Sequence, residues 1–195
     1  MSIGPVRSRH RCAGILVLFA AWVGGMKLAN AATDPLRSLV QISAQRLQIA
    51  RQVALEKWYS GARVEDPSRE AEVLQNAAKD GENVGLESTQ VEEFFKAQIE
   101  ANKLIQYSLL ADWRRDGRAP GHAAADLVKE IRPQLDEIEK RLIQELKQSA
   151  VARSVTTCPV DVAKAVGEYL DSRSVKVDSL EGAALDRALS AACIR

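Results

Sequence analysis

Apolar residues recur every three or four positions along three long stretches of this chain. The first stretch runs from Pro35 to Gly61, with apolar residues at Leu36, Leu39, Val40, Ile42, Leu47, Ile49, Ala50, Val53, Ala54 and Leu55. This spacing predicts an amphipathic helix of about seven turns with one apolar face. We expect the other elements to pack around it.

Two further helices are predicted in the middle of the chain. Asp66-Pro67-Ser68 is a helix-start signature, so we expect a helix from about Pro67 to Lys79 that stops at Asp80-Gly81. The next helix is expected to begin with Ser88 or Thr89 as its cap and to run to about 113–115.

The last part of the chain predicts one long helix and a shorter helical pair. The long helix covers about 123–151, and Pro133 within it is expected to produce a kink. The pair covers about 159–172 and 180–193, and no stretch alternates as a strand would. We therefore predict an all-α, single-domain bundle of about six helices, with core helices in 36–151 and a C-terminal pair in 152–195.

The N-terminus predicts a cleaved secretory signal peptide over residues 1–31. A basic segment precedes an apolar run from Cys12 to Val23, and Ala29-Asn30-Ala31 fits a cleavage site with small residues. The alternative is an N-terminal membrane anchor, although the run is short for a membrane span. We expect a periplasmic or secreted protein that begins near Ala32 and has no membrane partner after cleavage.

The charge balance argues against a nucleic-acid partner. The full chain has 27 Lys and Arg against 26 Asp and Glu, and residues 1–31 contain four of the cations and no acid, which leaves 23 against 26. Binding along a phosphate backbone requires a clear basic excess on one face.

Cysteine usage agrees with export. Cys158 and Cys193 form an even pair once Cys12 is removed with the leader, so an oxidising compartment predicts a disulfide between them. Two buried free thiols are the alternative. A metal site is not supported, because two cysteines and the scattered His10 and His122 lack the spacing of ligands.

The candidate chemistry lies in cations and amides rather than in nucleophiles. Arg46 and Lys57 are eleven residues apart, which is about three turns plus 20°, so both lie on one helix face about 16 Å apart. Asn102 and Gln106 share a face of the third helix in the same way. The alternative is that the cations are ordinary solvated residues and that the two amides lie on a wet surface or form a satisfied hydrogen bond in the core. Together they suit a rearrangement governed by positioning and electrostatics, without a covalent step.

The spacing of these residues resembles a known family. The pattern Arg46, Lys57, Asp66-x-x-Arg69-Glu70 and Asn102-x-x-x-Gln106 is similar to that of the all-α chorismate mutases. The signal peptide, the extra C-terminal helices and Arg141 in the fourth helix resemble their exported gamma subclass. The resemblance covers about residues 36–193.

The resemblance implies rearrangement of chorismate to prephenate by a homodimer, with no metal or cofactor. It assigns the two substrate carboxylates to Arg46, Arg69 and Arg141. It assigns the ether oxygen to Lys57 and Gln106, the substrate hydroxyl to Glu70, and positions lining the site to Asp66 and Asn102. The competing hypothesis is a non-catalytic exported helical protein, an adaptor or ligand sensor, that uses the same cationic pocket.

Overall fold

The computed structural model describes residues 1, 2, 4, 34–121 and 126–194. The expected leader apart from residues 1, 2 and 4, its cleavage site near Ala31, and His122 lie outside the described residues. Within the described ranges every regular element is helical, and no helix combines the length and apolarity needed to cross a membrane.

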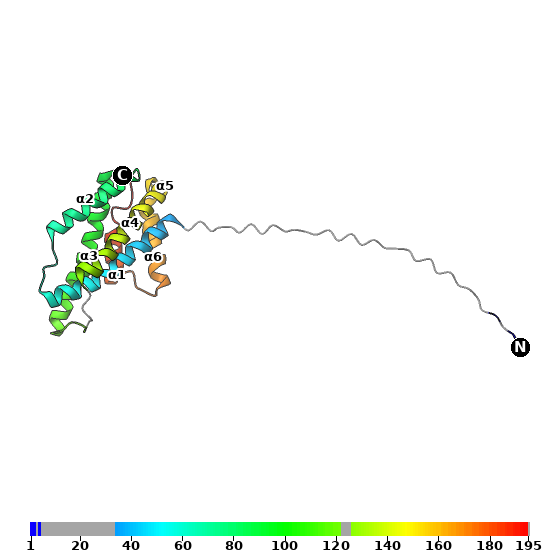
Figure 1. Cartoon of the computed structure of the whole chain (residues 1–195), viewed down its shortest axis with the longest axis horizontal. Coiled ribbons are helices and arrows are strands. Elements are labelled where there is room, and N and C mark those ends of the chain that lie inside the picture. Colours follow the sequence, from blue (N-terminus) through cyan, green and yellow to red (C-terminus); the bar gives the residue numbers. More distant parts are fainter. Residues whose placement is uncertain (3, 5–33, 122–125, 195) are drawn as a thin grey trace. The chain divides into compact units, whose positions relative to one another are not determined.

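The first helix, α1 (Pro35–Ser60), has the extent that its apolar pattern predicts (Figure 1). The Asp34 carboxylate accepts a hydrogen bond from the Leu36 amide at 3.0 Å, and Pro35 fits the first turn because its missing N–H is not needed there. Gly61 ends the helix at φ +69°, a backbone conformation that glycine adopts without strain.

The second helix, α2 (Pro67–Asn83), continues through Gly81, where the sequence predicted a stop. Gly81 is buried, and a Cβ at this position would lie 2.6 Å from a methyl carbon of Val91. The glycine therefore permits close packing of α2 against α3 (Ser88–Asp116) rather than ending the helix. The α3 cap also differs from the prediction: Glu87 is the N-cap, without a side-chain hydrogen bond, and Ser88 is already helical.

The predicted helix over 123–151 is divided into three elements. They are η1 (Leu127–Ile131), a turn with wider i to i−5 hydrogen bonding, then α4 (Arg132–Gln148) and α5 (Ala150–Ser154). Pro133 has no N–H to donate to the preceding turn, and the wide turn lies directly before it. Residue 123 lies outside the described residues.

The C-terminal helices are α6 (Cys158–Ser172) and α7 (Leu180–Leu189), and the disulfide between Cys158 and Cys193 is present. Helix α7 is four residues shorter than predicted, so Cys193 lies beyond its end. The bond thus joins the start of α6 to the segment that follows α7.

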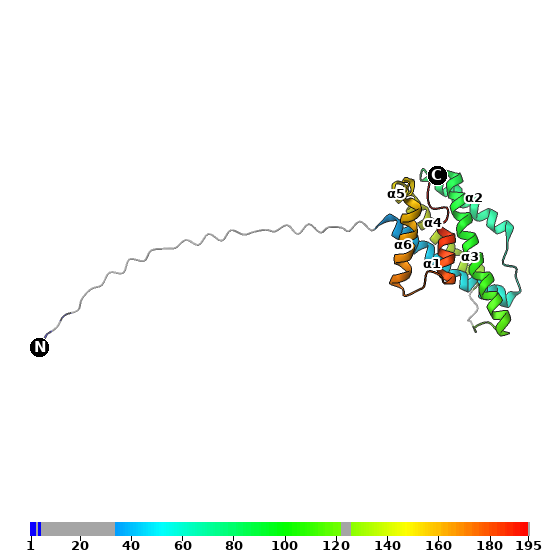
Figure 2. The ribbon, with the colours of Figure 1, turned by 180° about the vertical axis from the view of Figure 1, so that it is seen from behind.

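Helix α1 contacts α3, α4, α6 and α7, and α3 in turn packs against α2 and α7 (Figures 1 and 2). The shared apolar core includes Leu39, Phe94, Phe95 and Leu142, all nearly inaccessible to solvent. This arrangement brings one face of each of α1, α2, α3 and α4 to a common space.

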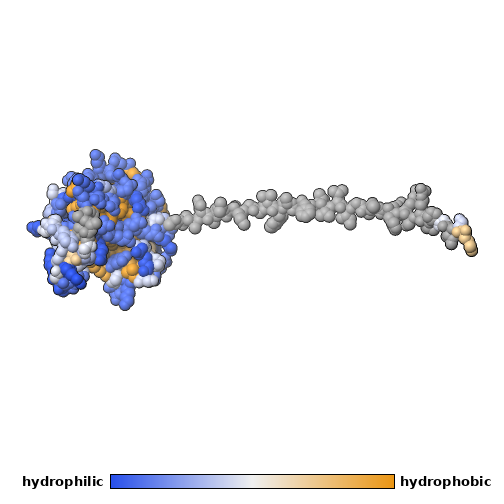
Figure 3. Space-filling view, turned by 60° about the horizontal axis from the view of Figure 1, so that its bottom comes forward, coloured by the Kyte–Doolittle hydropathy of each residue, from blue (hydrophilic) through white to orange (hydrophobic). Residues whose placement is uncertain are grey.

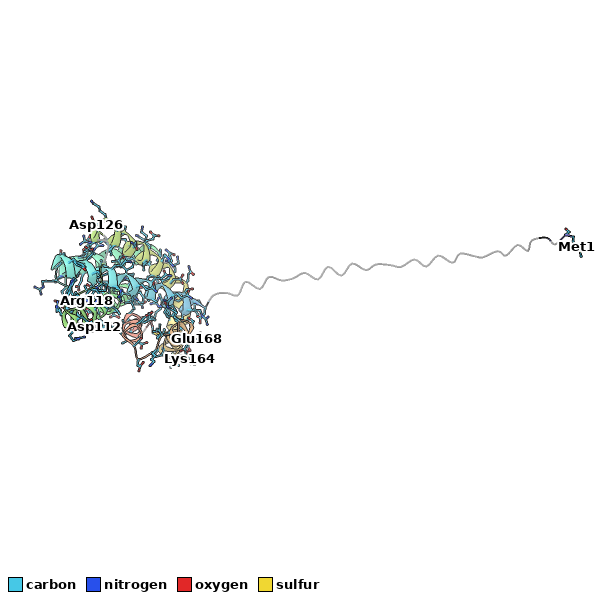
Figure 4. All side chains as sticks on the ribbon, turned by 90° about the horizontal axis from the view of Figure 1, so that it is seen from below. Met1, Asp112, Arg118, Asp126, Lys164 and Glu168 are labelled. Carbon is cyan, nitrogen blue, oxygen red and sulfur yellow. A yellow bond between two sulfur atoms is a disulfide. The ribbon has the colours of Figure 1, made fainter. Side chains whose placement is uncertain are left out.

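The surface of the folded helices is mostly polar. The face shown in Figure 3 is largely hydrophilic, with a few separate apolar patches. On α6, the exposed Lys164 and Glu168 are neighbours (Figure 4), and Glu168 accepts a hydrogen bond from Arg37 of α1 at 2.6 Å. An exposed ion pair of this kind contributes at most about 1 kcal/mol, so the buried apolar contacts decide the packing.

Candidate active site

A cavity of about 140 Å³ lies among α1, α2, α3, η1 and α4. A single buried water needs roughly 10–15 Å³, so this space is far larger than a packing defect. Its lining combines apolar side chains with charged and amide groups: Arg46, Val53, Lys57, Val64, Asp66, Arg69, Glu70, Val73, Ile99, Asn102, Lys103, Gln106, Leu127, Arg132, Leu135, Asp136 and Glu139.

Arg46 is the most deeply buried cation of the cavity, with 6% of its surface exposed. Its Nη1 donates to the backbone oxygen of Gln98 at 2.9 Å, which fixes the guanidinium between α1 and α3. Burial lowers the pKa of Arg46 to about 10, and the carboxylate of Glu139 partly opposes this shift. Arg46 therefore remains charged at neutral pH.

Lys57 lies three turns further along α1 and lines the same cavity. Its ammonium nitrogen donates to the backbone oxygen of Val64 at 2.5 Å. Burial lowers the pKa of Lys57, while Asp66 and Glu70 favour its charged form. The eleven-residue spacing thus brings Arg46 and Lys57 to one cavity, as expected from a regular helix.

The first turn of α2 contributes Asp66, Arg69 and Glu70. The Asp66 carboxylate caps the helix by accepting from the Arg69 amide at 3.2 Å, and Glu70 accepts from the Asp66 amide at 3.3 Å. The Arg69 guanidinium, an unfavourable charge at a helix N-terminus, is compensated by Glu72 at 2.9 Å and Asp136 at 3.1 Å. Asp66 therefore both caps α2 and lines the cavity.

Helix α3 presents Ile99, Asn102, Lys103 and Gln106, whose spacing places them on one face. Asn102 Nδ2 donates to the backbone oxygen of Arg46 at 3.4 Å, and Asn102 Oδ1 accepts from Gln106 Nε2 at 2.7 Å. This chain of hydrogen bonds orients the Gln106 amide and leaves its second N–H to donate elsewhere. Gln106 Oε1 is buried and has no hydrogen-bond partner within the described protein.

Lys103 was not identified from the sequence. Its ammonium lies 3.2 Å from Glu70 and 2.7 Å from Glu100, and it lines the cavity beside Asn102. The signal was available in the sequence, because Lys103 is four residues after Ile99 and three before Gln106.

Helix α4 places one predicted site residue, Arg141, away from the cavity. Arg141 lies outside the cavity lining: it is exposed, and its Nη1 donates to Gln45 Oε1 at 2.9 Å. The cation that α4 contributes is Arg132, which is nine residues earlier and hence about 180° away around the helix. Leu135, Asp136 and Glu139 share the face of Arg132 and complete this wall.

The charges of the lining favour an anionic ligand over a metal ion. Five cations (Arg46, Lys57, Arg69, Lys103 and Arg132) meet four carboxylates (Asp66, Glu70, Asp136 and Glu139). Among the described residues no group of three or more His, Cys, Asp or Glu is arranged to hold a metal ion. Guanidinium groups bind carboxylates with strong hydrogen bonds, and ammonium and amide donors stabilise a developing oxyanion.

Known proteins with this architecture share one description. The chorismate mutase type II family matches residues 37–107. The crystal structure of chorismate mutase from Burkholderia phymatum is 42% identical with a TM-score of 0.78, and the match covers 83% of this chain and 98% of that one. The crystal structure of chorismate mutase from Burkholderia thailandensis is 34% identical with a TM-score of 0.76, and the match covers 82% of this chain and 99% of that one. A secreted chorismate mutase from Mycolicibacterium smegmatis is 29% identical over 156 residues, 78% of this chain and 86% of the relative.

Proposed function

The chain belongs to the chorismate mutase type II family, and we propose that it converts chorismate to prephenate in the cavity among α1, α2, α3 and α4. The observation that carries the proposal is the convergence of Arg46, Lys57, Arg69, Arg132 and Gln106 on this one cavity. Such convergence would be unexpected if these residues were ordinary solvated side chains.

The substrate is a dianion, and its two carboxylates need separate cationic partners. We assign them to Arg46, Arg69 and Arg132, with Arg132 in the role first expected of Arg141. Arg46 is held by Gln98 and Arg69 by its two acidic neighbours, so both guanidinium groups are ordered before the substrate arrives. Preordered groups lose less conformational freedom on binding, which favours one compact substrate conformer.

The reaction breaks one C–O bond and forms one C–C bond within the same molecule, and negative charge grows on the ether oxygen. Lys57 and the second N–H of Gln106 are the proposed donors to that oxygen. Preorganised donors of this kind each contribute on the order of 3–4 kcal/mol to a charge-separated transition state. No proton transfer, nucleophile or leaving group is needed, because the atoms of the substrate only change their connections.

Two acceptors complete the proposed site. Glu70 accepts from Lys103 at 3.2 Å, and its carboxylate has further lone pairs to accept a hydrogen bond from the substrate hydroxyl. Asn102 orients Gln106 through the 2.7 Å hydrogen bond and lies beside Arg46.

Turnover separates this proposal from a ligand-binding adaptor with the same pocket. Purified residues 32–195 are mixed with chorismate in buffer containing a metal chelator, and the product is identified by NMR. Prephenate formation at an enzymatic rate supports the proposal. Binding of chorismate without turnover would assign the cavity to an adaptor or sensor instead.

We also propose export to the periplasm or beyond, by cleavage of residues 1–31. The support is the N-terminal pattern of charge and small residues, the disulfide, and relatives that are named secreted. The intact mass of the protein recovered outside the cytoplasm tests this, and a protein that retains its N-terminus would contradict it. The homodimer implied by the family resemblance is tested by light scattering of the same sample.

A further inference from the structure

Glu139 is an unexpected group in a cavity for a dianion. It lies on the α4 wall beside Asp136 and faces Arg46, the buried cation of α1. A carboxylate at this place competes with a substrate carboxylate for the same guanidinium. The proposed reaction assigns Glu139 no role.

Glu139 also differs from the other carboxylates of the cavity. Asp66 caps α2, Glu70 accepts from Lys103, and Asp136 accepts from Arg69 at 3.1 Å. Within the described residues Glu139 has no hydrogen-bonding or ion-paired neighbour of this kind, and its link to Arg46 is electrostatic. Its oxygens are therefore available to a ligand.

We propose that Glu139 is a further substrate-binding residue of this site, and that it holds a proton when the dianionic substrate is bound. This rests on the proposed function. A protonated Glu139 can donate a hydrogen bond to a substrate carboxylate, whereas an ionised Glu139 repels that carboxylate and occupies Arg46. Substrate binding and proton binding at Glu139 are thus coupled.

The proton affinity of Glu139 is in the range that such coupling needs. Burial raises the pKa of Glu139 to about 7, Arg46 opposes this shift, and Asp136 and Asp80 add to it. A second negative charge nearby raises a carboxyl pKa further, so bound substrate favours the protonated form. By linkage, binding is tightest below pH 7 and weakens as the pH rises above it.

The other charged groups that line the cavity or act on Glu139 electrostatically come from four helices. They are Arg46 and Lys57 of α1, Arg69, Glu70 and Asp80 of α2 with the capping Asp66, Lys103 of α3, and Arg132 and Asp136 of α4. Arg46 has a pKa of about 10, and hydrogen bonds to Glu100 and Glu70 raise that of Lys103 despite its partial burial. Burial lowers the pKa of Lys57, so titration of Lys57 can also change binding with pH. A variant of Glu139 is therefore needed to distinguish the titration of Glu139 from that of Lys57.

The test compares kcat and KM for chorismate from pH 6 to 8.5 in the mature protein and in Glu139→Gln. For the wild type we expect kcat/KM to fall about tenfold or more between pH 6.5 and 8.5, mainly through KM, because only the protonated form binds well. In Glu139→Gln this fall should shrink to about twofold or less. Glu137→Gln is the matched control, since Glu137 lies on the same helix, is exposed and pairs with Lys140 at 3.6 Å.

The outcomes distinguish failure of the Glu139 proposal alone from failure of the proposed function. If chorismate turns over but the wild type and Glu139→Gln have the same pH profile, Glu139 is not coupled to binding and the proposed function stands. If nothing turns over, both proposals fail.

A second measurement needs no variant. Calorimetric titration of the wild type with prephenate at pH 7.5, in HEPES and in Tris, gives the number of protons taken up on binding. We expect between about one half and one proton per site, because most Glu139 side chains are ionised at this pH before binding. An uptake of zero would overturn the proposal.

Discussion

Arg132 and Arg141 lie on opposite faces of α4, nine residues apart, and only Arg132 lines the cavity. Arg141 instead donates to Gln45 at the surface. We therefore expect Arg132→Ala to lower kcat/KM by about 10- to 100-fold, since a hydrogen bond to a charged group contributes about 1.5–3 kcal/mol. Arg141→Ala is the matched control and should stay within about twofold of the wild type, because a surface contact contributes little. Equal losses in both variants would contradict the assignment.

The amide side chain of Gln106 determines how we expect kcat to depend on pH. An amide donates a hydrogen bond without taking up a proton, so kcat of the wild type should change by less than about twofold between pH 5 and 8. In Gln106→Glu only the protonated side chain donates, so kcat should fall about tenfold per pH unit above the pKa of the new carboxyl.

The control is Gln144→Glu, on the exposed side of α4. A steep loss of kcat in the wild type over this range, with unchanged binding, would show that Gln106 is not the donor. The expected effect of Glu139 appears in KM, so the two residues are distinguished by separate kinetic constants.

Gln98 is a buried amide that joins three helices. Its Nε2 donates to Ser43 Oγ at 3.0 Å and to the backbone oxygen of Ala188 at 3.1 Å. Gln98→Met leaves both acceptors buried without a donor, so the free energy of unfolding should fall by about 1–3 kcal/mol in urea titrations. Because Arg46 bonds the backbone of Gln98 and not its side chain, kcat should stay within about threefold. Gln144→Met, at an exposed position, should change neither quantity.

The disulfide between Cys158 and Cys193 closes a long loop, with a sequence separation of 35 residues. Replacing both cysteines with serine should lower the free energy of unfolding by about 3–4 kcal/mol, chiefly because the unfolded chain gains freedom. Urea titration of the oxidised wild type and the double variant measures this difference. A difference below about 1 kcal/mol would mean that the bond constrains the unfolded chain little.

Local periodicity predicted most of the helices and placed Arg46 with Lys57 on one face and Asn102 with Gln106 on another, whereas Asp66, Arg69 and Glu70 were assigned to the site through the family resemblance. Arg46 and Lys57 share a face because α1 is regular from Pro35 to Ser60, so counting residues was sufficient. The sequence pattern favoured Arg141, because it adjoins the apolar residues Ile138 and Leu142. Tertiary packing instead turns the opposite face of α4, which carries Arg132, toward the cavity.

Other features depend on contacts between distant segments. Gly81 is a typical helix breaker by its local sequence, and only its contact with Val91 explains why α2 continues through it. Glu139 is unremarkable on a charged helix until α1 places Arg46 opposite it. Such neighbours come from tertiary packing and cannot be counted along one helix.

The central claim is that Lys57 and its neighbours in this cavity rearrange chorismate. Its most direct test is the initial rate of chorismate loss for the mature wild type, Lys57→Ala and Lys147→Ala, an exposed control on α4. We predict turnover by the wild type and by Lys147→Ala, and a kcat lowered by about 10²- to 10³-fold in Lys57→Ala, as expected when one preorganised donor is lost. A Lys57→Ala protein that consumes chorismate at close to the wild-type rate would contradict the account.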